Sequence, residues 1–295
     1  MTDATQVTRR SARAEALSRA LYRFRQSRLS VVGATMVAFV LFFTLFGGIL
    51  APYPEHVAGG VDTAHRFAAP SLAHPFGTNE LGQDVLSLVM AGTPVSVAAG
   101  FAVVFVGTVL GVIVGALAGF NGGWIDDVLM RFSDLMLTIP SLILAMAVAA
   151  ALGPGFVNMI IAIALAWWPG YARLVRGEVL QAREEVYVAA ARAIGASPAR
   201  VLFRHILPNI VSPVIVKMSL DMGFAILTVA ALGFIGIGVR PPTPEWGTLL
   251  SIARGYMPDF WWTAVFPGMA MFLAVFGFNL LGDGLRDVLD PRARR

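Results

Sequence analysis

Side chains with reactive chemistry are few in this sequence, and many of them gather in one stretch. Residues 184–209, EEVYVAAARAIGASPARVLFRHILPN, carry Arg192, Arg200, Arg204 and His205 on an alanine-rich scaffold. The chain has no Cys, which excludes a thiol nucleophile and a thiolate metal site. It has no H-E-x-x-H or G-x-S-x-G motif and no convincing pair of catalytic carboxylates. We therefore expect no catalytic residue.

Cofactor sites are not indicated either. The phosphate-binding loop G-x-x-x-x-G-K-[ST] needs a lysine, and the only lysine, Lys217, lies outside any such pattern. The four histidines, His56, His65, His74 and His205, are scattered, and we interpret them as solvated loop residues rather than metal ligands. We expect that this chain binds no cofactor and no metal.

The composition predicts a membrane protein. Hydrophobic residues make up 57% of the chain, charged residues 14%, and the mean hydropathy is +0.73; soluble domains have roughly 45–50% and 25%. A helix needs about 20 apolar residues to cross the hydrocarbon layer. We expect an all-α, polytopic membrane protein with six transmembrane helices, at residues 31–51, 95–120, 135–152, 156–171, 211–237 and 261–281.

Basic residues predict the orientation. With the N-terminus inside, 19 of the 22 Lys and Arg residues fall on the cytoplasmic side, as the positive-inside rule requires. Both termini are therefore expected in the cytoplasm. The apolar run after Arg28 is too long for a cleaved signal peptide. The isoelectric point near 9.9 fits contacts with membrane lipid headgroups, so no nucleic-acid partner is expected.

This topology divides the chain into segments. A basic cytoplasmic segment precedes a membrane domain that carries two outer loops and one large cytoplasmic loop, and a short tail follows. The boundaries are 1–29 for the first segment, 30–292 for the membrane domain, 52–92 and 238–261 for the outer loops, 177–209 for the cytoplasmic loop and 293–295 for the tail.

The outer loops have helical signals. Asn79 can cap a helix that has Glu80 in its first turn. Apolar residues then follow at helical spacing, at Leu81, Val85, Leu88 and Val89. This pattern fits an amphipathic helix on the outer membrane surface and equally an N-terminal extension of the second span. In the second outer loop, a proline-rich start precedes another short helix.

The cytoplasmic loop predicts two helices joined by a corner. Residues 178–194 form the first helix, Gly195 suits the left-handed position after its end, Ser197 caps the second helix and Pro198 opens it. The second helix ends at Pro208. Val188, Ala191 and Ile194 share one face, and Leu202, Phe203 and Ile206 share another. The pair fits either a docking element or an amphipathic pair in the lipid headgroups.

The same loop resembles the signature of binding-protein-dependent ABC importer permeases: Glu-Ala-Ala, three residues, Gly, about nine residues, then Ile-x-Leu-Pro. The glutamate position falls on Ala189 here. The positions that match or nearly match are Ala190, Ala191, Gly195, Ile206, Leu207 and Pro208.

Four stretches resemble specifically the C-type permease of dipeptide, oligopeptide and nickel importers. They are HPFGTNELGQDVLS, RHILPN, LGFIGIGVRPPTPEWG and NLLGDGLRDVLDPR, and the likeness covers residues 28–292. Asn79 and Gln83 stand where this family is expected to have Asp and Arg.

The resemblance implies the type I ABC importer fold in the cell inner membrane and a function in importing peptides or similar solutes. It also implies a second, B-type permease subunit, two cytoplasmic ATPase subunits that hold ATP and Mg, and an extracytoplasmic substrate-binding protein. The residues expected to couple to the ATPase are Ala190, Ala191, Gly195, Ala196, Ser197, Pro198 and Arg200. The expected contacts to the binding protein are Asn79, Glu80, Asp84 and Glu245.

Polar residues inside the spans are candidates for a path. Asn158 and Asn279 either line the path or bond between helices, whereas Lys217 and Asp221 are spaced for an ion pair within one helix. The alternative function is an ion-gradient-driven secondary transporter, which predicts a buried carboxylate in the middle of the spans.

Overall fold

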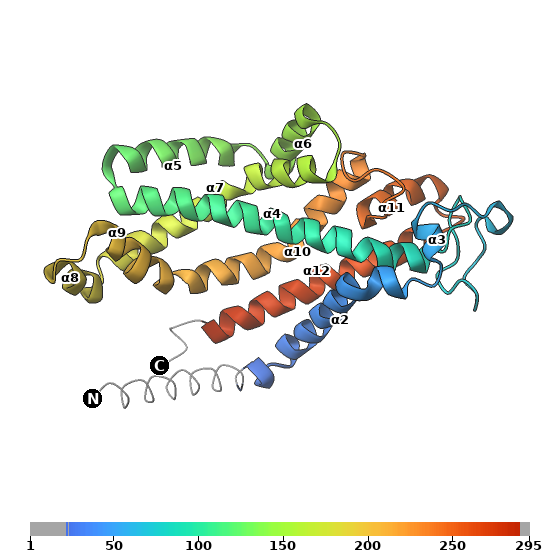
Figure 1. The fold of residues 1–295 in the computed structure, drawn as a ribbon, viewed down its shortest axis with the longest axis horizontal. Coiled ribbons are helices and arrows are strands. Elements are labelled where there is room, and N and C mark those ends of the chain that lie inside the picture. The colour runs from blue at the N-terminus through green and yellow to red at the C-terminus, as the bar shows by residue number, and fades with distance from the viewer. Residues whose placement is uncertain (1–21, 23, 290–295) are drawn as a thin grey trace.

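The computed structural model describes residues 22 and 24–289 of the 295-residue chain. The long helices run along the longest axis of the molecule, and short helical segments gather at its two ends (Figure 1). Within the described part no strand is formed, and one isolated bridge pairs Thr78 with Asp84. The prediction of an all-α fold is confirmed.

Four described helices are long and apolar enough to cross a membrane. They are α2 (Arg28–Leu50), α4 (Val85–Asn121), α10 (Val211–Ile235) and α12 (Trp262–Leu289). These helices correspond to the first, second, fifth and sixth predicted spans. The second one begins at residue 85, ten residues earlier than its apolar run predicts, because its outer end is buried by the two outer loops.

The third predicted span, 135–152, is wrong as a single helix. Two helices, α5 (Gly123–Thr138) and α6 (Ser141–Leu152), meet there at a bend of 92° and pass the span criteria only together. Pro140 excludes its predecessor from the helical region, and Ile139 is accordingly extended, with φ −88° and ψ 127°.

The fourth predicted span, 156–171, is only the first part of the 28-residue helix α7 (Phe156–Arg183). The second part of α7 carries Arg173, Arg176, Glu178 and Arg183, and α7 does not meet the length and composition criteria for a span. These criteria therefore support four spans in the described residues, or five with the bent pair, rather than six.

The first part of α5, residues 123–134, lies outside the predicted spans. Its Asp126 accepts two hydrogen bonds from Arg176 of α7, at 2.5 and 2.6 Å, so a bidentate ion pair fixes this helix to its neighbour.

The centre of the molecule lies between α4, α7 and α10, where Val103, Ile163 and Ile226 are fully buried. Gly111, Gly115 and Gly119 form a stripe on α4 that faces α7. A Cβ added at Gly119 would lie 3.0 Å from the carbonyl oxygen of Arg176, and one at Gly115 would overlap the carbonyl oxygen of Ala172. The two backbones thus touch along this stripe.

The short elements form the two ends. One end holds α8 (Val186–Ala193), α9 (Pro198–Arg200), η2 (Val201–Ile206) and η3 (Leu207–Asn209). The opposite end holds α3 (Pro54–Val57), η1 (Thr63–His65), α11 (Trp246–Ala253) and η4 (Arg254–Tyr256). We call these the corner end and the loop end.

We expect Gly115→Leu to lower the free energy of unfolding by about 1–3 kcal/mol, because a side chain at this position must push α4 away from α7. Gly48→Ala in α2 is the matched control, since no atom lies within 4 Å of the added Cβ. Thermal unfolding in detergent, followed by tryptophan fluorescence, measures both. Equal midpoints for the two variants would contradict the close α4–α7 contact.

Candidate functional site at the two ends of the bundle

The corner end has the caps that the sequence predicts. Gly195 has φ +82°, and the amides of Gly195 and Ala196 donate to the carbonyls of Arg192 and Ala191, both at 3.0 Å. This is the Schellman arrangement, in which a glycine closes the end of a helix. The Ser197 hydroxyl then accepts from the Arg200 amide, at 3.4 Å, and caps α9. The predicted corner is confirmed.

The prediction of one continuous helix over 178–194 is wrong. α7 ends at Arg183, and Glu185, with φ −73° and ψ 143°, is extended before α8 begins. The break turns α8 so that Val188 is buried in an apolar cluster at the corner end, and Ala191 is buried as well. The burial of these side chains overrides the local preference for one long helix.

The second helix of the corner is also less regular than predicted. One α-helical turn, α9, leads into the π-helical turn η2 and then into the 3-10 turn η3, which extends past Pro208 to Asn209. Helical structure therefore continues beyond the predicted stop, because a 3-10 turn tolerates a proline near its start.

Apolar residues of the corner divide into two groups. Val188, Leu202 and Ile206 are buried. In contrast, Ile194 is 87% exposed and Phe203 is 67% exposed, so each departs from the apolar face predicted for it. The corner therefore presents two large apolar side chains outward, next to the exposed Ser197, Pro198 and Arg200.

At the loop end, Asn79 forms a turn and does not cap a helix. Its Oδ1 atom accepts from the amides of Leu81 and Gln83, both at 2.9 Å, and its Nδ2 atom donates to Gln83 Oε1 at 2.9 Å. The cap of α4 is Asp84, whose Oδ2 accepts from the Ser87 amide at 2.8 Å. The separate amphipathic surface helix is therefore wrong, and the extension of the second span, which begins after Asp84, is correct.

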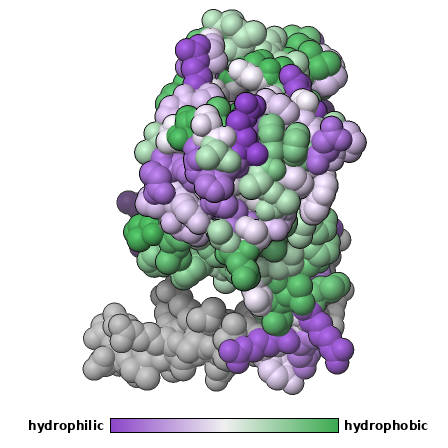
Figure 2. Space-filling model, turned by 90° about the vertical axis from the view of Figure 1, so that its right-hand side faces the viewer, coloured by the Kyte–Doolittle hydropathy of each residue, from purple (hydrophilic) through white to green (hydrophobic). Residues whose placement is uncertain are grey.

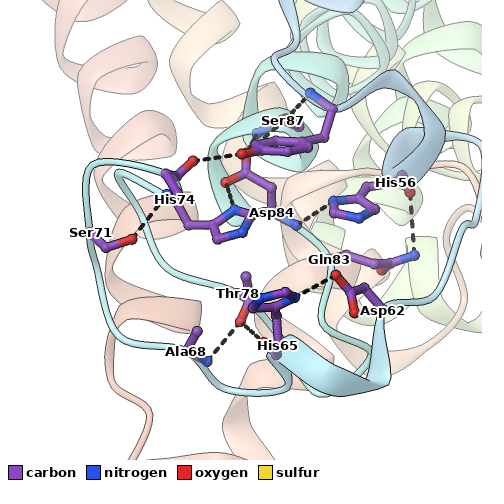
Figure 3. A network of polar contacts seen from close by, with 12 residues as sticks. His56, Asp62, His65, Ala68, Ser71, His74, Thr78, Gln83, Asp84 and Ser87 are labelled. Atoms are coloured by element: carbon purple, nitrogen blue, oxygen red, sulfur yellow. Dashed lines mark hydrogen bonds and ion pairs between the residues drawn. The ribbon is translucent and has the colours of Figure 1, made fainter.

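Asp84 is the centre of a buried network (Figure 3). Its carboxylate lies 3.0 Å from Nδ1 of His74, and its amide donates to Nδ1 of His56 at 3.0 Å. His56 and His74 are 7% and 8% exposed, so their prediction as solvated residues is wrong. Within the described residues, no three His, Cys, Asp or Glu side chains are placed to hold a metal ion.

Glu245 is fully buried where α11 meets α4 and α10. Its carboxylate accepts from the amides of Gly247 and Thr248, at 2.8 and 2.9 Å, and from the Ser96 hydroxyl of α4, at 3.2 Å. The neighbouring indole of Trp246 donates to the carbonyl of Val89 at 3.1 Å. Glu245 therefore caps α11 and joins it to α4.

A cleft of about 420 Å³ lies between the two outer loops. Asn79, Glu80 and Glu245 line it, so it brings together three of the four residues expected to contact a binding protein; Asp84 is buried in the network beside it. Of these four residues, only Glu80 is partly exposed. Hydrophilic residues gather on this end of the molecule (Figure 2). Burial raises the pKa of the Glu80 carboxyl.

Sequence reasoning missed several residues of the loop end, namely Ser96, His56, His74 and Trp246. Ser96 lies within an apolar helix, 149 positions from Glu245, so no local pattern indicates its contact. The histidines gave no signal in their spacing. Trp246 could have been predicted at this site only because it directly follows Glu245 in the sequence.

Comparisons with known proteins decide the family. The family model described as "Binding-protein-dependent transport system inner membrane component" matches residues 107–295. The model of the "N-terminal TM domain of oligopeptide transport permease C" matches residues 16–73. This chain belongs to the binding-protein-dependent transport system inner membrane components. It is a permease subunit of the ABC-importer class and not an ion-gradient-driven secondary transporter.

Several curated relatives of this permease are similar over most of its length. A probable D,D-dipeptide transport system permease protein of Escherichia coli K12 is 44% identical, over 92% of this chain and 91% of the relative. A dipeptide transport system permease protein of Alkalihalophilus pseudofirmus is 40% identical, over 93% and 90%. A glutathione transport system permease protein of Escherichia coli O157:H7 is 43% identical, over 92% and 89%.

A solved structure supports the fold alone. A chain of the methionine ABC transporter MetNI, in inward-facing conformations, superposes with a TM-score of 0.54 at 19% identity. The match covers 68% of this permease and 96% of that chain.

The permeases of this family are not enzymes, and the ATPase activity lies on separate subunits.

The polar residues of the permease helices occupy different places. Asn158 donates to the carbonyls of Leu152 and Gly153, at 2.9 and 3.1 Å, and so closes the turn between α6 and α7. Asn279 of α12 packs beside Gly223 of α10.

The predicted ion pair within α10 is confirmed. Lys217 Nζ lies 3.0 Å from Asp221 Oδ2 and also stands over the Tyr171 ring, 4.9 Å from its centroid.

We expect Glu245→Ala to lower the free energy of unfolding by about 2–4 kcal/mol, since it removes the cap of α11 and leaves the donors of Ser96, Gly247 and Thr248 without their acceptor. Asp259→Ala, which changes an exposed acid in the same outer loop, is the control and should leave stability unchanged. Thermal unfolding in detergent compares the two variants. A similarly small effect of both would show that Glu245 does not hold the loop end together.

Proposed function

We propose that this permease forms half of the translocation path of an ATP-driven importer, together with a second permease subunit of the B type. Its loop end faces outward and receives an extracytoplasmic substrate-binding protein. Its corner end faces the cytoplasm, where two ATPase subunits hold ATP and Mg. This orientation places both termini inside, because 19 of the 22 basic residues then lie on the cytoplasmic side.

The exposed apolar tip of the corner is the observation that carries this proposal. Ile194 and Phe203 are exposed, whereas the apolar side chains of Val188, Leu202 and Ile206 in the same corner are buried. Large apolar side chains held on a capped turn are suited to insertion into a pocket of another protein. The coupling residues Ala190, Gly195, Ser197, Pro198 and Arg200 surround this tip and are exposed.

Two predicted coupling residues have a supporting role in this proposal. Ala191 is buried, and Ala196 is half-buried. We propose that they fix the corner against the bundle rather than touch the ATPase.

The relatives indicate the class of solute. Two of them are named as dipeptide-type permeases and one as a glutathione permease. We propose that this permease transports small peptides or peptide-like solutes. Asn158 closes a turn and Asn279 packs between helices, so Asn279 is the better candidate for a residue near the path.

The test is reconstitution in nanodiscs with the partner permease and ATPases. ATPase activity is measured with candidate binding proteins loaded with a dipeptide, glutathione or nickel. Stimulation by one loaded binding protein supports the importer and identifies its solute. Uptake that persists without the ATPases and follows a proton gradient would refute the proposal.

We expect Ile194→Asp to reduce the stimulated ATPase rate roughly tenfold, because a charged side chain at the tip cannot enter an apolar pocket. Val186→Asp is the matched control: Val186 is 82% exposed at the start of α8 and is not part of the tip. Its rate should equal that of the wild type. If Ile194→Asp has no effect while the complex is stimulated normally, the tip does not contact the ATPase.

Gly195→Val tests whether the shape of the turn matters for coupling, because it leaves the side chains of the tip unchanged. Both Gly195 and Gly177 have open space around them, but only Gly195 has a positive φ, +82°. A β-branched residue there costs about 1–2 kcal/mol and should open the turn. We expect the stimulated ATPase rate to fall with Gly195→Val and to stay unchanged with Gly177→Ala. A fully stimulated Gly195→Val complex would mean that the turn has no role in coupling.

A further inference from the structure

The cleft at the loop end contains one charged group that the structure leaves free. Glu80 lines the cleft and is partly exposed, and within the described residues its carboxylate takes part in no ion pair. The other acid of the cleft, Glu245, is fully buried and occupied by donors from Ser96, Gly247 and Thr248. Glu80 is therefore the group that a ligand of this cleft would meet.

The electrostatic setting of Glu80 favours a cation. Burial raises the pKa of its carboxyl, and the positive charge of Arg66 only partly offsets this effect. A carboxylate that has lost part of its hydration gains from a positively charged partner. Among the described residues Arg66 forms no ion pair with Glu80, so the carboxylate can still gain from a closer positive charge.

The walls of the cleft are apolar and would suit an alkyl chain. Leu81, Leu88, Leu249 and Ile252 line it, and Leu81 and Ile252 are 41% and 36% exposed. The proline-rich segment at 241–244 forms the opposite rim, with Pro241 and Pro242 exposed. A Lys or Arg side chain buries its alkyl part on such a wall and keeps its charged end at a polar group.

The cleft is confined to the loop end. All its lining residues fall in 59–88 and 241–252, and none lies in the middle or the inner part of a long helix. A solute that crosses the membrane must pass between the long helices, so this position fits a docking contact rather than a solute-binding site along the translocation path.

We propose that this cleft receives a Lys or Arg side chain of the extracytoplasmic binding protein, with the positive charge at Glu80 and the alkyl part on Leu81 and Ile252. The proposal rests on the proposed function, because it assumes that a binding protein docks on the loop end. It assigns to Glu80 the selection of that partner. Asn79, Asp84 and Glu245 hold the two sides of the cleft in place.

The experiment titrates the reconstituted complex with the loaded binding protein that stimulates its ATPase. In Glu80→Gln, the concentration for half-maximal stimulation should rise about tenfold, with unchanged basal and maximal rates. Glu55→Gln, which neutralises an exposed acid on α3 outside the cleft, is the matched control and should behave as the wild type. Glu80→Asp keeps the charge and should recover part of the affinity.

Single Lys→Ala and Arg→Ala variants of the binding protein identify the partner residue. One of them should weaken stimulation of the wild type but have no further effect on Glu80→Gln.

The outcomes are distinct. An unchanged midpoint in Glu80→Gln overturns the inference and leaves the proposed function intact. A lower maximal rate with the same midpoint also overturns it, because Glu80 would then act on the passing solute. If no loaded binding protein stimulates the wild type, the proposed function fails and the inference fails with it.

Discussion

The close contact between α4 and α7 is the constraint on which both ends of this permease depend. Inside lipid, helices gain nothing from the hydrophobic effect against one another, so they are held by packing and by polar contacts. The glycine stripe of α4 lets its backbone touch that of α7. α4 begins in the Asp84 network at the loop end, and α7 leads directly into the corner. A shift between these two helices would therefore move one end against the other.

α10 gives the two ends a second physical connection. It begins two residues after η3, and at its outer end Gly233 packs against the carboxylate of Glu245. Gly247 of α11 packs equally closely on Ala230 of α10. The Lys217–Asp221 pair lies within α10, and Lys217 also stands over the Tyr171 ring of α7. In the proposed mechanism, motion of the corner would reach the loop end along this helix, which is a contiguous element of the kind that coupling requires.

The sequence predicts those turns, caps and helices that are determined by residues close together in the chain. Gly195, Ser197 and Pro198 each have a strong preference for one position in a turn or cap, and each occupies that position. The apolar runs likewise predict the four long helices. In contrast, the break before α8 depends on how much this helix gains from packing, and the bend at Ile139 depends on the proline that follows it. Apolar periodicity alone predicts neither feature.

Charged and polar residues of the loop end show why the candidate site was only partly predictable. Asn79, Glu80, Asp84 and Glu245 look equivalent in the sequence, as acids or amides in exposed loops. Three of them are buried, because each finds donors that only the folded chain provides: a turn for Asn79, Ser87 and His74 for Asp84, and Ser96 with α11 for Glu245. A buried polar group is costly unless it is paired, and these three are paired. The partly buried Glu80 is the exception, and its free carboxylate is for that reason the one polar group of the set that is available to a partner.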